Sequence, residues 1–282
     1  MATTPPDYVL EAFGVSGSPQ RAGRAWDNGW VYESLVLSEV RNPAQAMWSA
    51  KVRSLIDIDG VAVASSVRAS DGRQIIAGWQ ARHFVPGALA PRADETIVLA
   101  GRIDAALESV SRPQFLVDQN PGLFLTLDRA AWAADPIAIL EKLLDPGSIP
   151  RADCAEALTT AGELLSLRQD LVVPAQQLQV CHADVVGTLL YDGTATPVLT
   201  DIVPAWHPQG WTAALAAVDS VAMMGADEGL LGRFDHVDDF AQLLVRAMLF
   251  RLFVHAVHPQ SQPGAHRGLA RAASLVRAFV SQ

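Results

Sequence analysis

The hydrophobic pattern of this chain changes near residue 86, and that change constrains the fold more than any other feature. Three short runs rich in β-branched and aromatic residues come first, at 29–40, 60–70 and 73–84. The turn signals DNG and SDG bound them. After VPG (85–87), apolar residues recur at spacings of three and four, over about 92–110, 151–168, 210–225, 236–257 and 265–280. The pattern predicts an α+β, two-lobed chain, with a small antiparallel β-sheet lobe over 1–85 and a larger, mainly helical lobe over 86–282.

One helix is expected inside the small lobe, between the strand runs at 29–40 and 60–70. Asn42 can cap this helix, and Pro43 suits its first position. An apolar face is expected to consist of Ala46, Met47, Ala50, Leu55 and Ile58. The predicted order in this lobe is strand, strand, helix, strand, strand.

Composition narrows the classes of function. The chain has 282 residues, 50% of them hydrophobic, and carries a net charge of -9 with a pI of about 5.2. An acidic balance of this kind argues against binding to the nucleic-acid backbone. The most apolar late segment is interrupted by Arg246 and Arg251, and the N-terminus has no secretory pattern, so we expect a cytoplasmic protein without a membrane span. Cys154 and Cys181 lack metal-ligand spacing and are expected to be core residues.

A hydrophobic stretch at 181–203 carries three polar groups that would be costly to bury alone: His182, Asp184 and Asp201. Asp184 follows one short apolar run and Asp201 ends another, with a turn between them. Two carboxylates placed in this way can share one polar cleft. One could accept a proton from a hydroxyl while the other holds a magnesium ion, the division of labour that phosphoryl transfer needs. In the alternative interpretation both aspartates have only a structural role and cap turns, which explains less of the pattern.

The segments HADV, TLLYDG and PVLTDIV resemble the catalytic region of the aminoglycoside phosphotransferase and choline kinase branch of the protein-kinase-like fold. The resemblance implies Asp184 as catalytic base, His182 as a brace of the catalytic loop and Asp201 as the metal ligand. It also implies Asp219, in AAVDSVA, as a helical residue that ties down that loop. The stretch after Asp201 is similar to a group of actinobacterial phosphotransferase-like proteins.

The N-terminal half is similar to the nucleotide-binding lobe of the same branch. GRAWDNGWVYESLVLS resembles a glycine-containing turn followed by the strand that ends at the phosphate-binding lysine, and AGWQARHFVPG resembles the last strand and the hinge, whose backbone could bind adenine. The resemblance therefore implies ATP and Mg²⁺ as cofactors. The candidate nucleotide-binding residues are Arg24, Ser38, Lys51, Gln80, Arg82 and Phe84.

Two positions depart from the pattern of that branch. Ser38 stands where the strand should end in lysine, and an uncharged hydroxyl cannot orient phosphates as a point charge does. Thr188 stands where a metal-binding asparagine is expected, although its hydroxyl could still touch magnesium. Lys51, or Arg21 and Arg24 in the turn, could compensate for the missing charge; Lys51 is otherwise an ordinary solvated helix residue.

The tryptophans Trp26, Trp30, Trp48 and Trp79 all fall in the small lobe. Stacking of one of them on a base is conceivable, but core packing of a thin sheet is the favoured interpretation.

Two functions stay open on these observations. The first is an ATP-dependent phosphotransferase that moves the γ-phosphate to a hydroxyl of a small molecule, with Asp184 as base and Asp201 as Mg²⁺ ligand. The second is a pseudokinase, a binding or regulatory module that has lost catalysis with Ser38 and Thr188. The acceptor and the oligomeric state are not indicated by the sequence.

Overall fold

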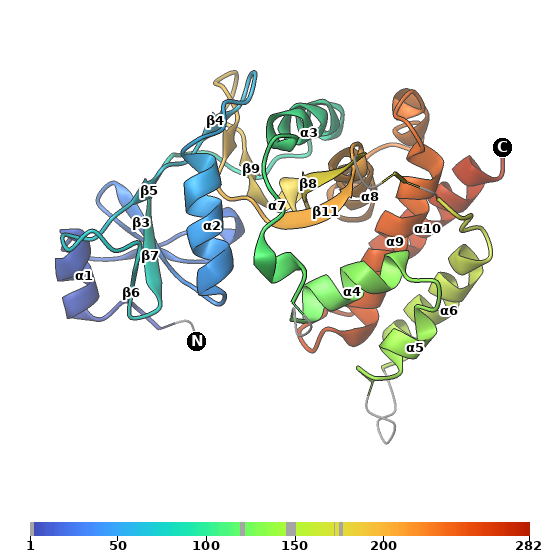
Figure 1. Ribbon diagram of the computed structural model, residues 1–282, viewed down its shortest axis with the longest axis horizontal. Helices are drawn as coiled ribbons and strands as arrows, with labels where there is room; N and C mark the ends of the chain where they lie inside the picture. Colours follow the sequence, from blue (N-terminus) through green and yellow to red (C-terminus); the bar gives the residue numbers. More distant parts are fainter. Residues whose placement is uncertain (1–2, 119–121, 145–150, 172, 175–176) are drawn as a thin grey trace. The chain divides into compact units, whose positions relative to one another are not determined.

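A computed structural model describes residues 3–118, 122–144, 151–171, 173–174 and 177–282 of the chain. The chain forms two compact units (Figure 1). Unit 1 comprises Met1–Ala90 together with Ala183–Val203, and unit 2 comprises Pro91–His182 together with Pro204–Gln282. The segment that carries Asp184 and Asp201 is thus part of the same unit as the N-terminal sheet. The predicted lobes, 1–85 and 86–282, stay a prediction.

The main sheet of unit 1 is antiparallel, as the sequence predicts, and its strands run in the spatial order β1-β2-β3-β7-β5, with β6 also paired to β7. The bounds are β1 Gln20–Arg21, β2 Trp30–Tyr32, β3 Leu35–Glu39, β5 Ser66–Val67, β6 Ile75–Ile76 and β7 Trp79–His83. The central pair β3 and β7 brings Ser38 opposite Gln80 and Val36 opposite Arg82. This register decides which side chains meet at the site described below.

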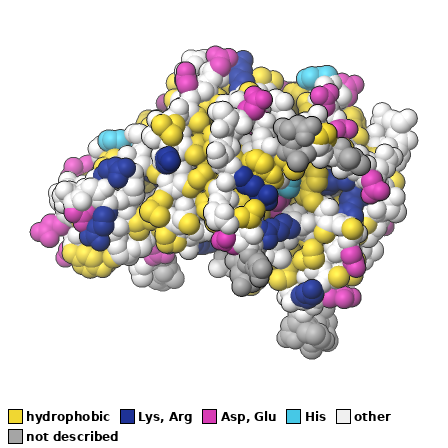
Figure 2. All heavy atoms as spheres, in the orientation of Figure 1, with side chains coloured by type: hydrophobic (Ala, Val, Ile, Leu, Met, Phe, Trp, Pro, Cys, Tyr) yellow, Lys and Arg dark blue, Asp and Glu magenta, His cyan; other side chains and the backbone are white. Residues whose placement is uncertain are grey.

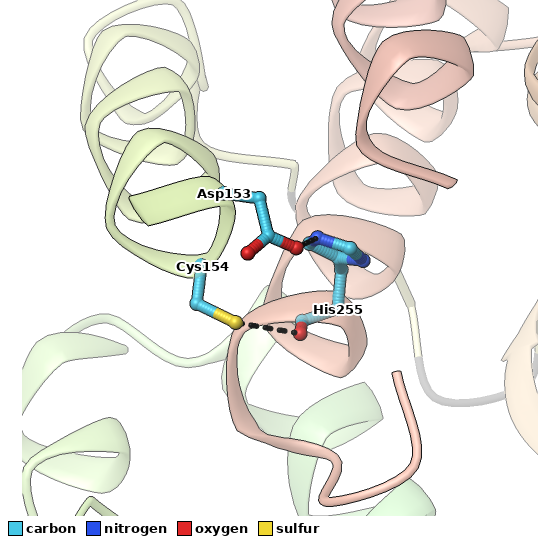
Figure 3. A group of neighbouring side chains, drawn as sticks. All are labelled: Asp153, Cys154 and His255. Carbon is cyan, nitrogen blue, oxygen red and sulfur yellow. Dashed lines mark hydrogen bonds and ion pairs between the residues drawn. The ribbon is translucent and has the colours of Figure 1, made fainter. Parts of the chain in front are cut away.

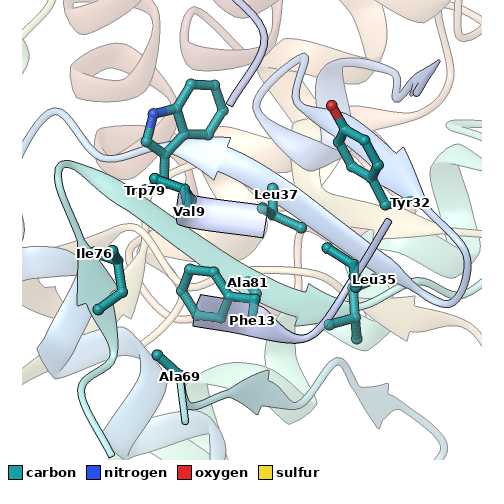
Figure 4. Close-up of a cluster of buried hydrophobic side chains, with 10 residues drawn as sticks. Val9, Phe13, Tyr32, Leu35, Leu37, Ala69, Ile76, Trp79 and Ala81 are labelled. Carbon is teal, nitrogen blue, oxygen red and sulfur yellow. The ribbon is translucent and has the colours of Figure 1, made fainter. Parts of the chain in front are cut away.

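One face of this sheet is covered by helix α1 (Asp7–Phe13), which the sequence analysis does not predict. Figure 4 shows the apolar side chains on this face, with Val9 and Phe13 of α1 among those of the strands. Trp79 belongs to this cluster and is buried, as the core-packing interpretation of the tryptophans expects. Burial of apolar area on this face contributes the main stabilisation of so thin a sheet.

Helix α2 (Pro43–Arg53) begins where the sequence predicts, with the Asn42 side chain accepting a hydrogen bond from the Gln45 backbone N–H. The predicted apolar face of this helix is wrong in part, because Ala50 and Ile58 are buried but two of its larger members are not. Met47 and Leu55 are exposed, and the buried side of the helix carries Ser49 and Arg53 among smaller apolar residues. Polar partners inside unit 1, rather than apolar contacts, decide which side of α2 faces inward.

A second, three-stranded sheet of unit 1 holds the segment that carries the two aspartates. It has the order β4-β10-β9, and the bounds are β4 Ala62–Val63, β9 Leu189–Leu190 and β10 Val198–Leu199. β9 pairs antiparallel to β10, whereas β4 pairs with β10 in parallel. The two embedded strands expected around the turn are therefore present, and Asp201 lies two residues beyond the end of β10.

Unit 2 is mainly helical, as predicted, and its described residues include one two-stranded antiparallel sheet. Its longer helices lie close to the predicted ranges: α3 Ala93–Leu107, α6 Ala152–Leu165, α8 Trp211–Met224, α9 Phe240–Val257 and α10 Ala265–Val280. The sequence analysis does not predict α4 (Leu123–Trp132) and α5 (Ile137–Leu140). The sheet consists of β8 (Leu178–His182) and β11 (Pro204–Pro208).

Helix α9 is the one element among the described residues that is long and apolar enough, by length and composition, to cross a membrane. Within the fold, 72% of its apolar window is buried against the rest of the protein. Its two arginines have internal partners, because Arg251 binds Asp219 and Arg246 binds the backbone carbonyl of Gln169. α9 therefore packs as the core helix of unit 2.

On the face drawn in Figure 2, charged groups are scattered between hydrophobic side chains, in keeping with the 18% charged content.

The tight turn before β2 provides a stability test. A Cβ on Gly29 would lie 2.4 Å from the backbone oxygen of Leu37, so we expect Gly29→Ala to lower the free energy of unfolding by about 2 kcal/mol through overpacking. Gly23, in the same turn, has open space at its Cβ position, and Gly23→Ala serves as the matched control with a change near zero. Urea denaturation of both variants measures the difference; equal stabilities would contradict the observed backbone approach.

Candidate functional site

Asp201 lies between two buried arginines of unit 1. Its Oδ1 accepts a 2.5 Å hydrogen bond from the Ser49 hydroxyl and lies 3.6 Å from Arg53 Nε. Its Oδ2 lies 3.8 Å from NH1 of Arg82. The arginine side chains are 1% and 0% exposed, whereas the carboxylate is 20% exposed. The residue expected to hold a metal ion is therefore already surrounded by two positive charges.

Arg82 connects four parts of unit 1 through one guanidinium. NH2 donates to the Ser38 hydroxyl at 3.1 Å and to Asp27 Oδ2 at 2.5 Å, and NH1 donates to the Thr200 carbonyl at 3.2 Å. Its Cζ also lies 5.4 Å from the centre of the Trp26 ring. Ser38 is small enough to leave room for this guanidinium, which arrives from the neighbouring strand. The cation that β3 lacks at Ser38 is thus supplied by β7.

Arg53 reaches the same place from helix α2. Its NH1 donates to the Ala64 carbonyl, its NH2 donates to the Ser66 hydroxyl at 2.9 Å, and its Nε donates to Ser49 at 3.2 Å. Burial lowers the pKa of Arg53 to about 10, and the nearby Asp201 carboxylate opposes that shift. The guanidinium stays charged at neutral pH, because even the lowered pKa is about three units above 7.

Asp184 precedes the short helix α7 (Val185–Thr188) and is 29% exposed. Its carboxylate folds back over the backbone, since a Cβ on Gly187 would lie 2.5 Å from both of its oxygens. NH2 of Arg24, in the turn before β2, lies 3.6 Å from Asp184 Oδ1. Both predicted carboxylates of unit 1 therefore have arginine neighbours.

The donor set around Asp201 does not fit a magnesium ion. Mg²⁺ takes an octahedral set of oxygens and needs a site free of competing cations. The Thr188 hydroxyl, the second expected ligand, donates at 2.7 Å to the carbonyl of Asp184 within the α7 turn. A dication beside Asp201 would face the buried charges of Arg53 and Arg82, an arrangement that costs on the order of several kcal/mol at an effective dielectric near 20.

Three of the other predicted nucleotide-binding residues are also located by the structure. Gln80 donates to Ser38 at 3.4 Å, and the ring of Phe84 lies 5.8 Å from that of Trp26. Lys51 is exposed on α2, two residues from Ser49 and therefore on the opposite side of the helix. Ser38, Gln80 and Arg82 are thus brought together with Asp201, and Lys51 is not. The binding roles of these residues stay predictions.

His182 and Asp219 belong to unit 2. His182 ends β8 and is buried, and its backbone N–H donates to the Thr212 hydroxyl at 2.9 Å. Both carboxylate oxygens of Asp219 accept hydrogen bonds from Arg251, at 2.6 and 2.5 Å. The roles implied for these two residues, as supports of the catalytic loop, stay predictions.

A buried carboxyl that the sequence analysis misses supports the end of β8. Asp104 on α3 accepts hydrogen bonds from the Thr212 hydroxyl and from the Gly210 backbone N–H. Burial raises the pKa of Asp104 to about 7, although these hydrogen bonds act in the opposite direction. Because Thr212 also binds the His182 backbone, this network links α3, α8 and the strand that leads to Asp184. An isolated Asp in an amphipathic helix gives no sequence signal of such a partner.

One further cluster of metal-ligand types lies in unit 2, where Asp153 and Cys154 of α6 approach His255 of α9 (Figure 3). His255 Nε2 is 2.9 Å from Asp153 Oδ2, and Cys154 Sγ donates to the His255 carbonyl. Arg151 binds both oxygens of Asp153, at 3.0 and 2.8 Å. The carboxylate is thus engaged by a cation, and the cluster is best explained as a polar contact between two helices.

Comparisons with known proteins bear on the fold. No protein-family model and no curated protein matches the sequence. Among solved structures, the chain is similar to a microcompartment-associated aminopropanol kinase, with 17% identity, a TM-score of 0.53, and coverage of 97% of this chain and 95% of that one. It is also similar to a spectinomycin phosphotransferase in complex with ADP and spectinomycin, with 9% identity, a TM-score of 0.57 and 96% coverage of both chains.

A choline/ethanolamine kinase family protein from Mesorhizobium loti gives 15% identity, a TM-score of 0.53 and 94% coverage of both chains. At these identities the likeness shows the fold. The chain has the two-lobed, protein-kinase-like fold shared by aminoglycoside phosphotransferases and choline kinases. The fold that the sequence resemblance predicts is therefore confirmed.

The ion-pair arrangement around Asp201 predicts an unusual stability effect. Asp201→Asn would leave the buried guanidinium of Arg53 without its counter-charge and leave Arg82 with Asp27 alone, so we expect it to lower the free energy of unfolding by roughly 3 kcal/mol. Asp192→Asn, at an exposed position in the turn after β9, is the matched control with little change. Guanidinium chloride denaturation checks both variants. An Asp201→Asn variant as stable as the wild type would mean that the arginines do not depend on this carboxylate.

Asp104 predicts a specific pH dependence. Its folded-state pKa of about 7 lies above its unfolded value of 3.8, so the stability it confers is complete below about pH 4 and is lost as pH rises to 7. Asp104→Asn should remove this loss, on the order of 3 kcal/mol, relative to the wild type. Urea denaturation at pH 4.5 and 7.5 measures it, with the exposed Asp235→Asn as control. Identical pH profiles for wild type and Asp104→Asn would contradict the buried, neutral carboxyl.

Proposed function

We propose that this protein is a kinase-like binding module that lacks magnesium-dependent phosphoryl transfer, which is the pseudokinase alternative of the sequence analysis. The observation that carries the proposal is the position of Asp201 between Arg53 and Arg82. A carboxylate neutralised in this way makes a poor metal ligand. The arginines are fully buried and hydrogen-bonded to other parts of unit 1, so they cannot simply move aside.

The contacts to the transition state that this protein lacks are large enough to affect the rate of phosphoryl transfer. Removing one preorganised charge contact to a transition state costs on the order of a hundred- to a thousandfold in rate. Here Ser38 replaces the lysine and the Thr188 hydroxyl is engaged with the α7 backbone. Added to the poor metal site, these changes favour binding over catalysis.

A small molecule is the partner that we propose for the module. Unit 2 has a half-open surface pocket of about 390 Å³, which a small molecule could enter. Its walls are mostly apolar, and Gln209, His236 and Asp238 add polar groups to the lining. The structural relatives include a phosphotransferase bound to spectinomycin and an aminopropanol kinase, so a hydroxylated small molecule is the class to test first.

One observation favours the second candidate, an active, cytoplasmic ATP-dependent phosphotransferase. Asp184 keeps a partly exposed carboxylate that lies close to the backbone at Gly187. A base with that exposure could accept a proton from a substrate hydroxyl. ATP and Mg²⁺ would be its cofactors.

Thermal melting with ATP, with and without Mg²⁺, separates the two functions. A ligand that binds only the native state must raise the melting temperature. We expect no Mg²⁺-dependent rise for the wild type and no transfer of the γ-phosphate to any hydroxylated acceptor tested. A magnesium-dependent rise that disappears in Asp201→Ala, together with transfer of the γ-phosphate, would overturn the proposal in favour of the second candidate; Asp192→Ala is the control.

A further inference from the structure

The turn between β1 and β2 is fastened to unit 1 at several points. The Thr200 hydroxyl donates to the Ala25 carbonyl at 2.6 Å, and Asp27 binds Arg82 at 2.5 Å. Asp27 and Asn28 adopt the left-handed conformation, with φ of 55° and 53°, which these two residue types tolerate better than most. The glycine-containing turn of the resemblance is thus held against unit 1 by its own side chains and backbone.

Trp26, in the middle of this turn, points into the interior of unit 1. It is 3% exposed and shares an apolar cluster with Val36 of β3, Leu190 of β9 and Val198 of β10. Its ring centre lies 5.8 Å from that of Phe84, at an interplanar angle of 48°. These neighbours come from β3, which carries Ser38, from the hinge, and from the two strands between Asp184 and Asp201.

The resemblance implies that adenine binds to the backbone of the hinge, and the Trp26 ring lies against Phe84 of that hinge. An indole is a flat, two-ring aromatic group of nearly the size of a purine. It needs the same apolar slot, and it can lie beside a cation through its π face, as Trp26 does beside Arg82.

We propose that the Trp26 indole occupies the base-binding slot of this fold, so that the wild-type protein binds no adenine nucleotide and the slot is cryptic. Removal of the indole would open a purine-sized cavity lined by Val36, Leu190 and Phe84. The affinity gained would come from contacts of the base rather than from the phosphates, so it would need no metal ion. The inference concerns nucleotide binding and does not depend on whether any phosphoryl group is transferred.

The test is calorimetric titration of Trp26→Ala with ADP in the presence of EDTA. We expect Trp26→Ala to bind ADP at least about tenfold more tightly than the wild type, at the lower end of what stacking of a base on an aromatic ring contributes. Trp30→Ala is the matched control, because Trp30 lies on the adjacent strand and packs against the other apolar cluster of unit 1. It should gain no affinity.

A circular dichroism spectrum establishes that each variant is folded. If Trp26→Ala does not fold, Trp26→Leu, which keeps an apolar side chain but frees part of the slot, must show a smaller gain in the same direction. Wild-type binding of ADP as tight as that of the folded variant would overturn the inference, and so would a folded variant that gains nothing. Magnesium-dependent γ-phosphate transfer by the wild type is a separate outcome, which would refute the proposed function.

Discussion

The contact between the Asp201 carboxylate and two buried guanidiniums organises the candidate site of unit 1. The Arg53 guanidinium reaches Asp201 from α2 and the Arg82 guanidinium reaches it from β7, and both side chains are buried. Taking such charges out of water is costly unless a counter-charge and further hydrogen bonds compensate. Asp201, Asp27 and carbonyl groups of the neighbouring segments meet that requirement. The position of α2, the docking of the turn before β2 and the end of β10 all follow from satisfying these two side chains.

The same arrangement is the basis for our proposal that a fold shared with small-molecule kinases carries different chemistry in this protein. A lysine at position 38 would place a flexible point charge at the end of β3. Serine instead offers a small hydroxyl, which accepts a hydrogen bond from Arg82 on the paired strand. A guanidinium is planar and donates hydrogen bonds to several acceptors in fixed directions, so it can bridge neighbouring segments. An ammonium is a point charge on a flexible side chain and would hold those segments less rigidly. As a result, the Arg82 guanidinium lies beside the Asp201 carboxylate, which is 20% exposed.

Much of the fold could be predicted from local sequence patterns. The cap at Asn42, the strand runs before residue 86 and the periodic helices after it all depend on neighbours within a few positions. The motif at 182–201 located both carboxylates of the site. The inward face of α2 could not be found in this way, because Ser49 and Arg53 face inward for a partner about 150 residues away in the chain. Arg82 appeared in the sequence as one candidate phosphate ligand among several, and its role as a bridge depends on a strand register that short strands specify weakly.

Titration with Mn²⁺, a spectroscopic substitute for Mg²⁺, tests most directly whether Asp201 is available to a metal ion. Electron paramagnetic resonance follows the free ion as it is added to the wild-type protein, with and without ATP. If Asp201 is neutralised by Arg53 and Arg82, the ion stays free up to millimolar concentration in both conditions, and Asp201→Asn gives the same curve as the wild type. A single saturable Mn²⁺ site in the wild type that disappears in Asp201→Asn would show that the carboxylate is available to metal and would contradict the central claim.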